Sequence, residues 1–255
     1  MDRRGQIFLL SCLVLLLFIV NYSFLDKALV DFLDEKTYVE VDRVIDGDTI
    51  AVNGSSVRLL GINSPERGEE YYSEAKEFLE GLVLDKKVAL ELSNKKDKYG
   101  RGLAFVFLSQ TNLNVELVRW GLANVYILDN KKYENELRDA WEECVEANVN
   151  LCEKSEDECA GCIEVYRFEE QEVVFRNICY FDCSLDGWEI KDEGRKKFMF
   201  EDFVLKKGWK VEVVVGEGED DAEVLYWEED YVWTDTGDTL FLRDGGGRLV
   251  LWEGY

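Results

Sequence analysis

Two stretches of this sequence combine acidic, basic and small residues at spacings that could do chemistry. In the first, Asp46 and Asp48 flank Gly47 at the entrance to a strand pattern. Two carboxylates at a glycine turn can supply the oxygen ligands that a hard cation prefers. In the second, Arg58 on a strand pattern is followed by the run Asn-Ser-Pro-Glu at 63–66, which holds the only proline of the chain. That run offers an amide, a hydroxyl and a carboxylate in a restrained segment.

A third stretch adds a second arginine. Arg101 follows Tyr99 in a loop bracketed by glycines. Two guanidinium groups can bind one phosphate, a cation can polarise it, and a glutamate can accept a proton from water. The chain contains no histidine, which excludes a histidine base and histidine-ligated metals. The three stretches together favour hydrolysis of a phosphodiester.

The segment that carries these stretches has the pattern of a small barrel with helices. Alternating, β-branched residues predict strands at 38–45, 49–52, 56–62, 88–92 and 103–108, and helical periodicity predicts helices at 69–83, 114–122 and 133–146. This order of elements suits a Greek-key barrel of the oligonucleotide-binding type. The expected fold class is mainly β with α, beginning with a five-stranded OB-fold barrel with helices.

In this order and spacing, the three stretches resemble the staphylococcal-nuclease-like, or thermonuclease, family over residues 37–147. The resemblance implies an endonuclease, a phosphodiesterase that hydrolyses DNA or RNA with Ca²⁺ as cofactor and leaves a 3′-phosphate. It implies three catalytic residues: Arg58 and Arg101 bind the scissile phosphate, and Glu66 is the general base. It implies that Ca²⁺ is bound by Asp48, Asn63 and the carbonyl of Ser64. It also implies that Tyr99 and Tyr126 bind the substrate and that Asp46 is a nearby acid.

Asn63 departs from the family pattern, which has aspartate there. The loss of one negative charge predicts weaker binding of a hard dication. The retained Arg58, Glu66 and Arg101 favour an active enzyme. The alternative is a non-catalytic surface protein whose barrel binds nucleic acid or another ligand. Taken singly, the arginines also read as surface ion pairs, and Glu66 as a helix cap.

The last third of the chain predicts an all-β region. Strand patterns lie at 163–168, 172–176, 187–191, 209–215, 223–227, 239–243 and 248–252. Seven short strands separated by turn residues predict an immunoglobulin-like β-sandwich. Four runs resemble a lamin-tail domain, namely 172–177, 185–188, 203–208 and 232–240. That resemblance implies a binding or tethering module, and its ligand is unknown.

The N-terminus predicts a membrane segment. Residues 7–25 carry no charge, and at 1.5 Å per residue they span about 28 Å, roughly a bilayer core. Arg3 and Arg4 precede this segment, so the positive-inside rule places the soluble part outside the cell. The alternative is a cleaved signal peptide and a secreted protein. The expected organisation is an anchor or signal segment at 1–25, a juxtamembrane linker at 26–36, the nuclease-like domain at 37–150, a Cys-rich acidic linker at 151–162 and the lamin-tail-like domain at 163–255.

The net charge bears on the binding partners of the protein, and the cysteine content bears on the compartment in which it folds. The formal net charge is −24, and residues 163–255 carry 11 basic and 24 acidic side chains. A polyanionic surface opposes nucleic acid, so a DNA or RNA substrate needs a local basic site or a cation. An even number of cysteines after the membrane segment predicts disulfides, with the pairing open. A zinc site formed by the first four of these cysteines is the alternative. The six are Cys144, Cys152, Cys159, Cys162, Cys179 and Cys183.

Overall fold

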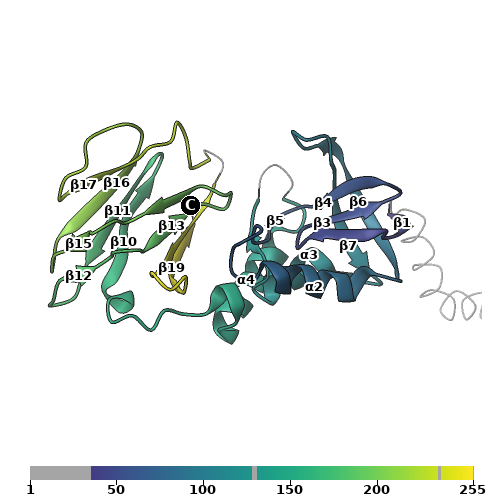
Figure 1. Ribbon diagram of the computed structural model, residues 1–255, viewed down its shortest axis with the longest axis horizontal. Helices are drawn as coiled ribbons and strands as arrows, with labels where there is room; N and C mark the ends of the chain where they lie inside the picture. Colours follow the sequence, from purple (N-terminus) through teal and green to yellow (C-terminus); the bar gives the residue numbers. More distant parts are fainter. Residues whose placement is uncertain (1–35, 128–130, 235–236, 255) are drawn as a thin grey trace, which may run out of the picture. The chain divides into compact units, whose positions relative to one another are not determined.

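The computed structural model describes residues 36–127, 131–234 and 237–254, and Figure 1 shows their elements. Residues 38–255 form one compact unit. The predicted membrane segment at 7–25 and nearly all of the predicted linker at 26–36 lie outside the described residues. Among the residues that are described, we find no helix with the length and apolar character needed to cross a membrane.

The first part of the described chain is built on a seven-stranded sheet. Its strands are β1 (Thr37–Glu40), β2 (Arg43–Asp46), β3 (Thr49–Val52), β4 (Ser55–Leu59), β6 (Lys87–Lys96), β7 (Gly102–Leu108) and β8 (Thr111–Asn112). The order is β1-β6-β7-β4-β3-β2, with β8 paired to β7. The hairpins β2–β3, β3–β4 and β6–β7 are antiparallel, and β4 pairs with β7 in parallel. This half-barrel fits an OB-fold, as the strand pattern predicted.

Three helices accompany the half-barrel at the predicted places: α2 (Tyr72–Val83), α3 (Leu113–Arg119) and α4 (Glu134–Ala147). Helix α2 starts later than its periodicity predicted because Tyr71 has a left-handed backbone, with φ of 63°. The side chain of Asn112 accepts a hydrogen bond from the backbone N–H of Asn114 at 3.1 Å and so caps α3. The two-residue strands β5 (Ile62–Asn63) and β9 (Asn124–Val125) pair with each other.

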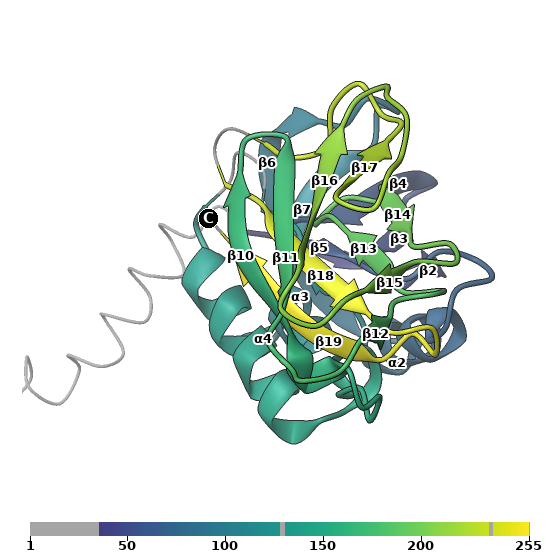
Figure 2. The same cartoon turned by 90° about the vertical axis from the view of Figure 1, so that its left-hand side faces the viewer.

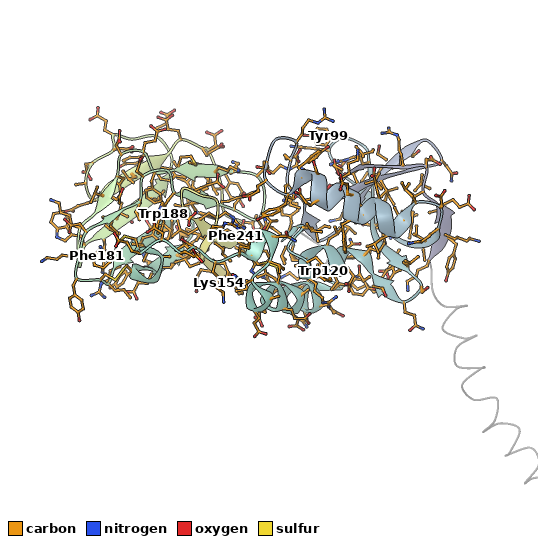
Figure 3. The ribbon with its side chains drawn as sticks, turned by 60° about the horizontal axis from the view of Figure 1, so that its bottom comes forward. Tyr99, Trp120, Lys154, Phe181, Trp188 and Phe241 are labelled. Carbon is orange, nitrogen blue, oxygen red and sulfur yellow. A yellow bond between two sulfur atoms is a disulfide. The ribbon has the colours of Figure 1, made fainter. Side chains whose placement is uncertain are left out.

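The second part is a β-sandwich. One sheet has the order β10-β11-β16-β17 and the other β14-β13-β18-β19, and Figure 2 looks onto the first. Residues of both sheets, such as Phe175 and Leu242, share one apolar core, which includes the buried Trp188 labelled in Figure 3. The strands are β10 (Ile163–Glu169), β11 (Glu172–Asn177), β12 (Cys183–Ser184), β13 (Glu189–Lys191), β14 (Lys197–Met199), β15 (Val204–Leu205), β16 (Lys210–Val215), β17 (Val224–Trp227), β18 (Thr239–Arg243) and β19 (Leu249–Gly254). The prediction of a mainly β fold is therefore confirmed.

The six cysteines after the predicted membrane segment form three disulfides: Cys144–Cys152, Cys159–Cys183 and Cys162–Cys179. The first joins α4 to the 3-10 turn at Asn150–Cys152, and the other two join the segment just before β10 to Cys179, which follows β11, and to Cys183 on β12. The predicted disulfides are present, and the thiolates that the alternative zinc site needs are all engaged in them.

Aromatic and backbone contacts join the sandwich to the barrel within the compact unit. The ring of Trp141 on α4 lies 5.1 Å from that of Phe241 on β18, and 6.4 Å from that of Trp252 on β19. Arg243 Nη1 donates to the backbone oxygen of Leu151 at 2.8 Å. Phe241 belongs to the same apolar cluster as the barrel core. The predicted linker is therefore packed against the sandwich.

Buried carboxyl groups follow β13 and precede β18. Glu193 accepts hydrogen bonds from the backbone N–H of Ile127 at 2.8 Å and from the Thr239 hydroxyl at 2.6 Å. Burial is the main cause, and the charge of nearby Asp238 a smaller one, that raises the pKa of Glu193 to about 7 and that of Asp192 to about 6. The folded chain therefore takes up protons at these groups near neutral pH.

We predict a pH dependence of stability from Glu193. Its pKa is about 7 in the folded chain, above the ordinary 4.5, so the free energy of unfolding should fall by about 3 kcal/mol as pH rises between these two values. Glu193→Gln should remove this part of the slope, whereas Glu217→Gln, at an exposed position, should retain it. Urea unfolding from pH 4 to 8 measures both. Equal slopes for Glu193→Gln and the unsubstituted chain would contradict the assignment.

Candidate active site

The candidate site is organised around Arg58 on β4, which is only 7% exposed. Its Nη1 donates to Asp48 Oδ1, and its Nη2 donates to Asn63 Oδ1 and, at 3.1 Å, to the backbone oxygen of Ile62. Strand register helps to place these groups, because Arg58 lies opposite Thr49, the residue after Asp48. Oxygens from two separate segments therefore converge on one guanidinium.

Asp48 is the buried anion of this group. Its Oδ2 accepts the backbone N–H of Ser64 at 3.0 Å, and its Oδ1 accepts the Thr49 hydroxyl at 2.9 Å. Burial opposes ionisation of Asp48, but Arg58 and these hydrogen bonds outweigh it and lower the pKa. At Asp46, burial and the charge of Asp48 raise the pKa. The two acids of the first stretch therefore differ in pKa, and Asp48 is the more readily ionised of the two.

Gly47 is required by packing. A Cβ atom at Gly47 would lie 2.7 Å from Cβ of Ala75 on α2 and 2.8 Å from Cβ of Ser64. Both distances are shorter than real contacts, so the turn approaches α2 and Ser64 more closely than any side chain permits. The sequence suggested a glycine that permits a turn, and the close approach is the reason that the structure adds.

Glu66 lies at the exposed edge of the site. Its carboxylate forms an ion pair with Arg195, and the two side chains are 48% and 49% exposed. The backbone N–H of Glu66 donates to Glu69 Oε2 at 2.7 Å, so Glu69 supplies the carboxylate cap at this turn. The carboxylate of Glu66 is directed to Arg195, which does not favour the reading of Glu66 as a cap.

The third stretch reaches the site through Thr49. Arg101 Nε donates to Asp97 Oδ2 at 2.5 Å, and its Nη1 lies 3.4 Å from the hydroxyl of Thr49. The Tyr99 ring, labelled in Figure 3, is 70% exposed and lies 5.4 Å from Cζ of Arg101. Arg101 thus borders the group around Arg58, and Tyr99 offers an open aromatic face beside it.

Tyr126 follows β9 and is half-buried. Its backbone N–H donates to the Gly61 oxygen at 2.8 Å, which places it beside the turn between β4 and β5. Burial is the main cause that raises the pKa of Tyr126; the charge of Arg58 opposes the rise, those of Asp192 and Asp238 add to it, and that of Arg195 opposes it. The predicted substrate-binding tyrosine therefore lies in a field to which both arginines and aspartates contribute.

Sequence reasoning missed the contact of Asn63 with the sandwich. Asn63 Nδ2 donates to the backbone oxygens of Glu193 at 2.6 Å and Gly194 at 3.1 Å. An aspartate cannot donate these bonds, so the amide has a structural reason. The signal that could have found this segment is its charge, because residues 191–197 read Lys-Asp-Glu-Gly-Arg-Lys-Lys in an acidic region.

Comparison with known proteins identifies the family to which the half-barrel belongs. Residues 56–154 match the family model described as staphylococcal nuclease homologue. The thermonuclease of Staphylococcus hyicus is 34% identical over 130 residues, which are 46% of this chain and 76% of that protein. The thermonuclease of Staphylococcus intermedius is 35% identical over 126 residues, 45% of this chain and 75% of that protein. Endonuclease YncB of Bacillus subtilis is 34% identical over 131 residues, 46% of this chain and 62% of that protein.

The chain therefore belongs to the staphylococcal nuclease family. The resemblance drawn from the three stretches is confirmed at the level of family. The roles of single residues and the resemblance of residues 163–255 to a lamin-tail domain stay predictions.

We predict that Gly47→Ala destabilises the chain by about 1–3 kcal/mol, because the methyl group overpacks the contact of the turn with Ala75 and Ser64. Gly81→Ala is the matched control. It lies in α2 with no atom within 4 Å of the added Cβ, and it should be neutral or stabilising by up to about 1 kcal/mol. Urea unfolding compares the two. Equal effects would contradict the packing role of Gly47.

Proposed function

We propose that this protein is a nuclease that hydrolyses phosphodiester bonds of DNA or RNA, with Arg58, Glu66 and Arg101 as its catalytic residues. The observation that carries the proposal is the convergence of Arg58, Asp48 and Asn63 at one end of a half-barrel in a chain of the staphylococcal nuclease family. Nuclease relatives with about one third identity support the same activity.

In the proposed reaction, the guanidinium groups of Arg58 and Arg101 bind the non-bridging oxygens of the scissile phosphate. Glu66 accepts a proton from water, whose oxygen forms a bond to phosphorus. The bond between phosphorus and the 5′-oxygen breaks, and the leaving oxygen takes a proton from solvent. The products are a 3′-phosphate and a 5′-hydroxyl. Tyr99 and Tyr126 would lie against the nucleotide, and Asp46, whose Oδ1 accepts the backbone N–H of Asp48 at 3.2 Å, would be a nearby acid.

We propose Ca²⁺ as the cofactor, held by Asp48, Asn63 and the carbonyl oxygen of Ser64. The Oδ1 atoms of Asp48 and Asn63 converge on one positive group, Arg58, and oxygen donors of this kind suit a hard cation, which would have to take the place of the guanidinium between them. A bound dication would polarise the phosphate and stabilise the charge that develops on it. With one carboxylate and one amide among these side chains, the site should bind Ca²⁺ weakly.

We further propose that residues 7–25 anchor the protein in a membrane with residues 37–255 outside the cell, or are cleaved to leave a secreted protein. Charge placement in the sequence supports the orientation, since Arg3 and Arg4 precede the apolar run. Three disulfides in the described part support an oxidising compartment. The sandwich would act as a lamin-tail-like tethering module.

Degradation of nucleic acid tests the proposed activity. The purified full chain should degrade single-stranded DNA or RNA in millimolar Ca²⁺ and stop when a chelator is added. Glu66→Gln should lower kcat by about 10²–10⁴ because the base is lost, whereas Glu74→Gln, at an exposed position on α2, should not. Full activity in excess chelator would remove the cation from the mechanism. Binding without cleavage would favour the non-catalytic alternative.

Restoring the family carboxylate at position 63 should have two effects. Asn63→Asp loses the two bonds that Nδ2 donates to Glu193 and Gly194, so in chelator the chain should be less stable by about 1–3 kcal/mol. It also adds a charged oxygen ligand, so Ca²⁺ should raise the unfolding temperature of this variant more than that of the unsubstituted chain.

The control for that comparison is Asp48→Asn, which removes the remaining carboxylate and should shrink the Ca²⁺-dependent rise. Thermal unfolding with Ca²⁺ or chelator measures all three proteins. Unchanged stability of Asn63→Asp in chelator would contradict the contact with the sandwich. An unchanged response to Ca²⁺ would place residue 63 outside the coordination shell.

A further inference from the structure

A loop of the sandwich reaches the candidate active site of the barrel. This loop, residues 192–196, joins β13 to β14 and is called here the 192–196 loop. Its backbone oxygens at Glu193 and Gly194 accept hydrogen bonds from Asn63, and its Arg195 forms an ion pair with Glu66. Both barrel residues belong to the site of the proposed nuclease. The sandwich therefore contributes residues that contact this site.

The loop is held firmly enough to present Arg195 at one place. The backbone N–H of Lys196 donates to Asp192 Oδ1 at 2.9 Å, which closes the turn. The carboxylate of Glu193 accepts the N–H of Ile127 in the barrel and the hydroxyl of Thr239 on β18. The loop is thus bonded to both the barrel and its own sheet, and Arg195 extends from a supported backbone.

The 192–196 loop and the residue on either side of it also concentrate positive charge. Lys191, Arg195, Lys196 and Lys197 fall within seven residues of a region with 24 acidic and 11 basic side chains. Lys197 Nζ pairs with Glu69 at 2.8 Å, and Lys196 Nζ with Glu229 at 2.9 Å. Arg195 is directed instead to Glu66, the proposed general base. Of these four cations, Arg195 is the one whose ion pair lies at the candidate site, so a polyanionic substrate approaching an acidic protein would meet its guanidinium there.

Arg195 is within reach of a bound phosphate. A water that Glu66 activates lies about 3 Å from the carboxylate and about 3 Å from phosphorus. A guanidinium that contacts the same carboxylate is therefore only a few ångströms from the phosphate oxygens. Arg195 also follows Gly194, whose backbone oxygen accepts a hydrogen bond from Asn63, so its backbone lies beside the group around Arg58.

We infer that Arg195 is a substrate-binding residue supplied by the sandwich, and that its guanidinium binds a backbone phosphate of the nucleic acid at or next to the scissile bond. This inference rests on the proposed nuclease function. When the phosphate binds, its oxygens replace the carboxylate of Glu66 as acceptors of the Arg195 N–H groups. Glu66 is then released to accept the proton from water.

The exposure of the Glu66–Arg195 ion pair favours a role of Arg195 in binding substrate over a role in blocking the site. An ion pair between two half-exposed side chains contributes little in water, because both ions are well solvated when apart. Such a contact is too weak to keep out a substrate that releases counterions and binds the guanidinium through two oxygens. The pair therefore holds Arg195 near the site without closing it.

The test compares substrate binding by the full chain and its variants. A fluorescently labelled single-stranded DNA oligonucleotide is titrated in chelator, which prevents turnover, at several salt concentrations. Arg195→Ala should weaken binding about tenfold and lower the slope of log affinity against log salt by about 0.7. Arg195→Lys should have a smaller effect, because it retains charge and loses the bidentate geometry. With Ca²⁺, kcat/KM of Arg195→Ala should fall about tenfold, mainly through KM.

Arg176→Ala is the matched control, because Arg176 lies 3.7 Å from Glu164 in an ion pair of similar exposure, 44% and 42%, on the sandwich. It should leave binding and kcat/KM unchanged. An Arg195→Ala protein with unchanged binding, or with raised kcat/KM, would overturn the inference, the latter by identifying the loop as a block. Equal weakening by Arg176→Ala would overturn it too, as an effect of net charge. If the unsubstituted chain neither binds nor cleaves DNA or RNA, the proposed nuclease function itself fails.

Discussion

The buried guanidinium of Arg58 is the interaction on which the architecture of the site depends. A charge that is 7% exposed needs compensating oxygens, and removal of one partner of a buried pair costs about 3–5 kcal/mol. The oxygens come from Asp48 before β3 and from Ile62 and Asn63 on β5. The first stretch and the end of the second are thereby held together at one end of the half-barrel. Asn63 then uses its amide nitrogen to bind the sandwich. The guanidinium of Arg58 thus connects the local fold of the barrel to the contact between the barrel and the sandwich.

Local patterns predicted the longer elements, because a longer strand or helix shows its period in the sequence. The seven strand segments of the sandwich and the three helices after residue 69 lie within a few residues of their predicted places. The strands β5 and β9 were not predicted as separate strands, because two residues cannot establish an alternation. The parallel pairing of β16 with β17 was also not foreseen, since a strand's own sequence does not specify its neighbour.

The site was predictable to the extent that its residues lie in short, spaced stretches. The grouping of Asp48 and Asn63 around Arg58 follows from such stretches meeting in a known barrel. The part supplied by Glu193 to Arg195 lies about 130 positions away in sequence, and spacing within the barrel carries no information about it. Asn63 shows the difference clearly. From the sequence it is a weakened metal ligand, whereas in the folded chain its amide also donates to a loop that an aspartate would repel.

The packing of Trp141 against Phe241 and Trp252 bears on how the protein can be divided. A recombinant fragment ending at Asn150 would correspond to the nuclease-like segment of the sequence, yet it would lack Cys152 and leave Cys144 as an unpaired thiol. It would also present the indole of Trp141 to water instead of to two aromatic rings. Such a truncation would therefore invite aggregation and mispairing. For the same reason, exchange of the sandwich for another module during evolution would have to replace these aromatic side chains as well, so the two halves are expected to be inherited together.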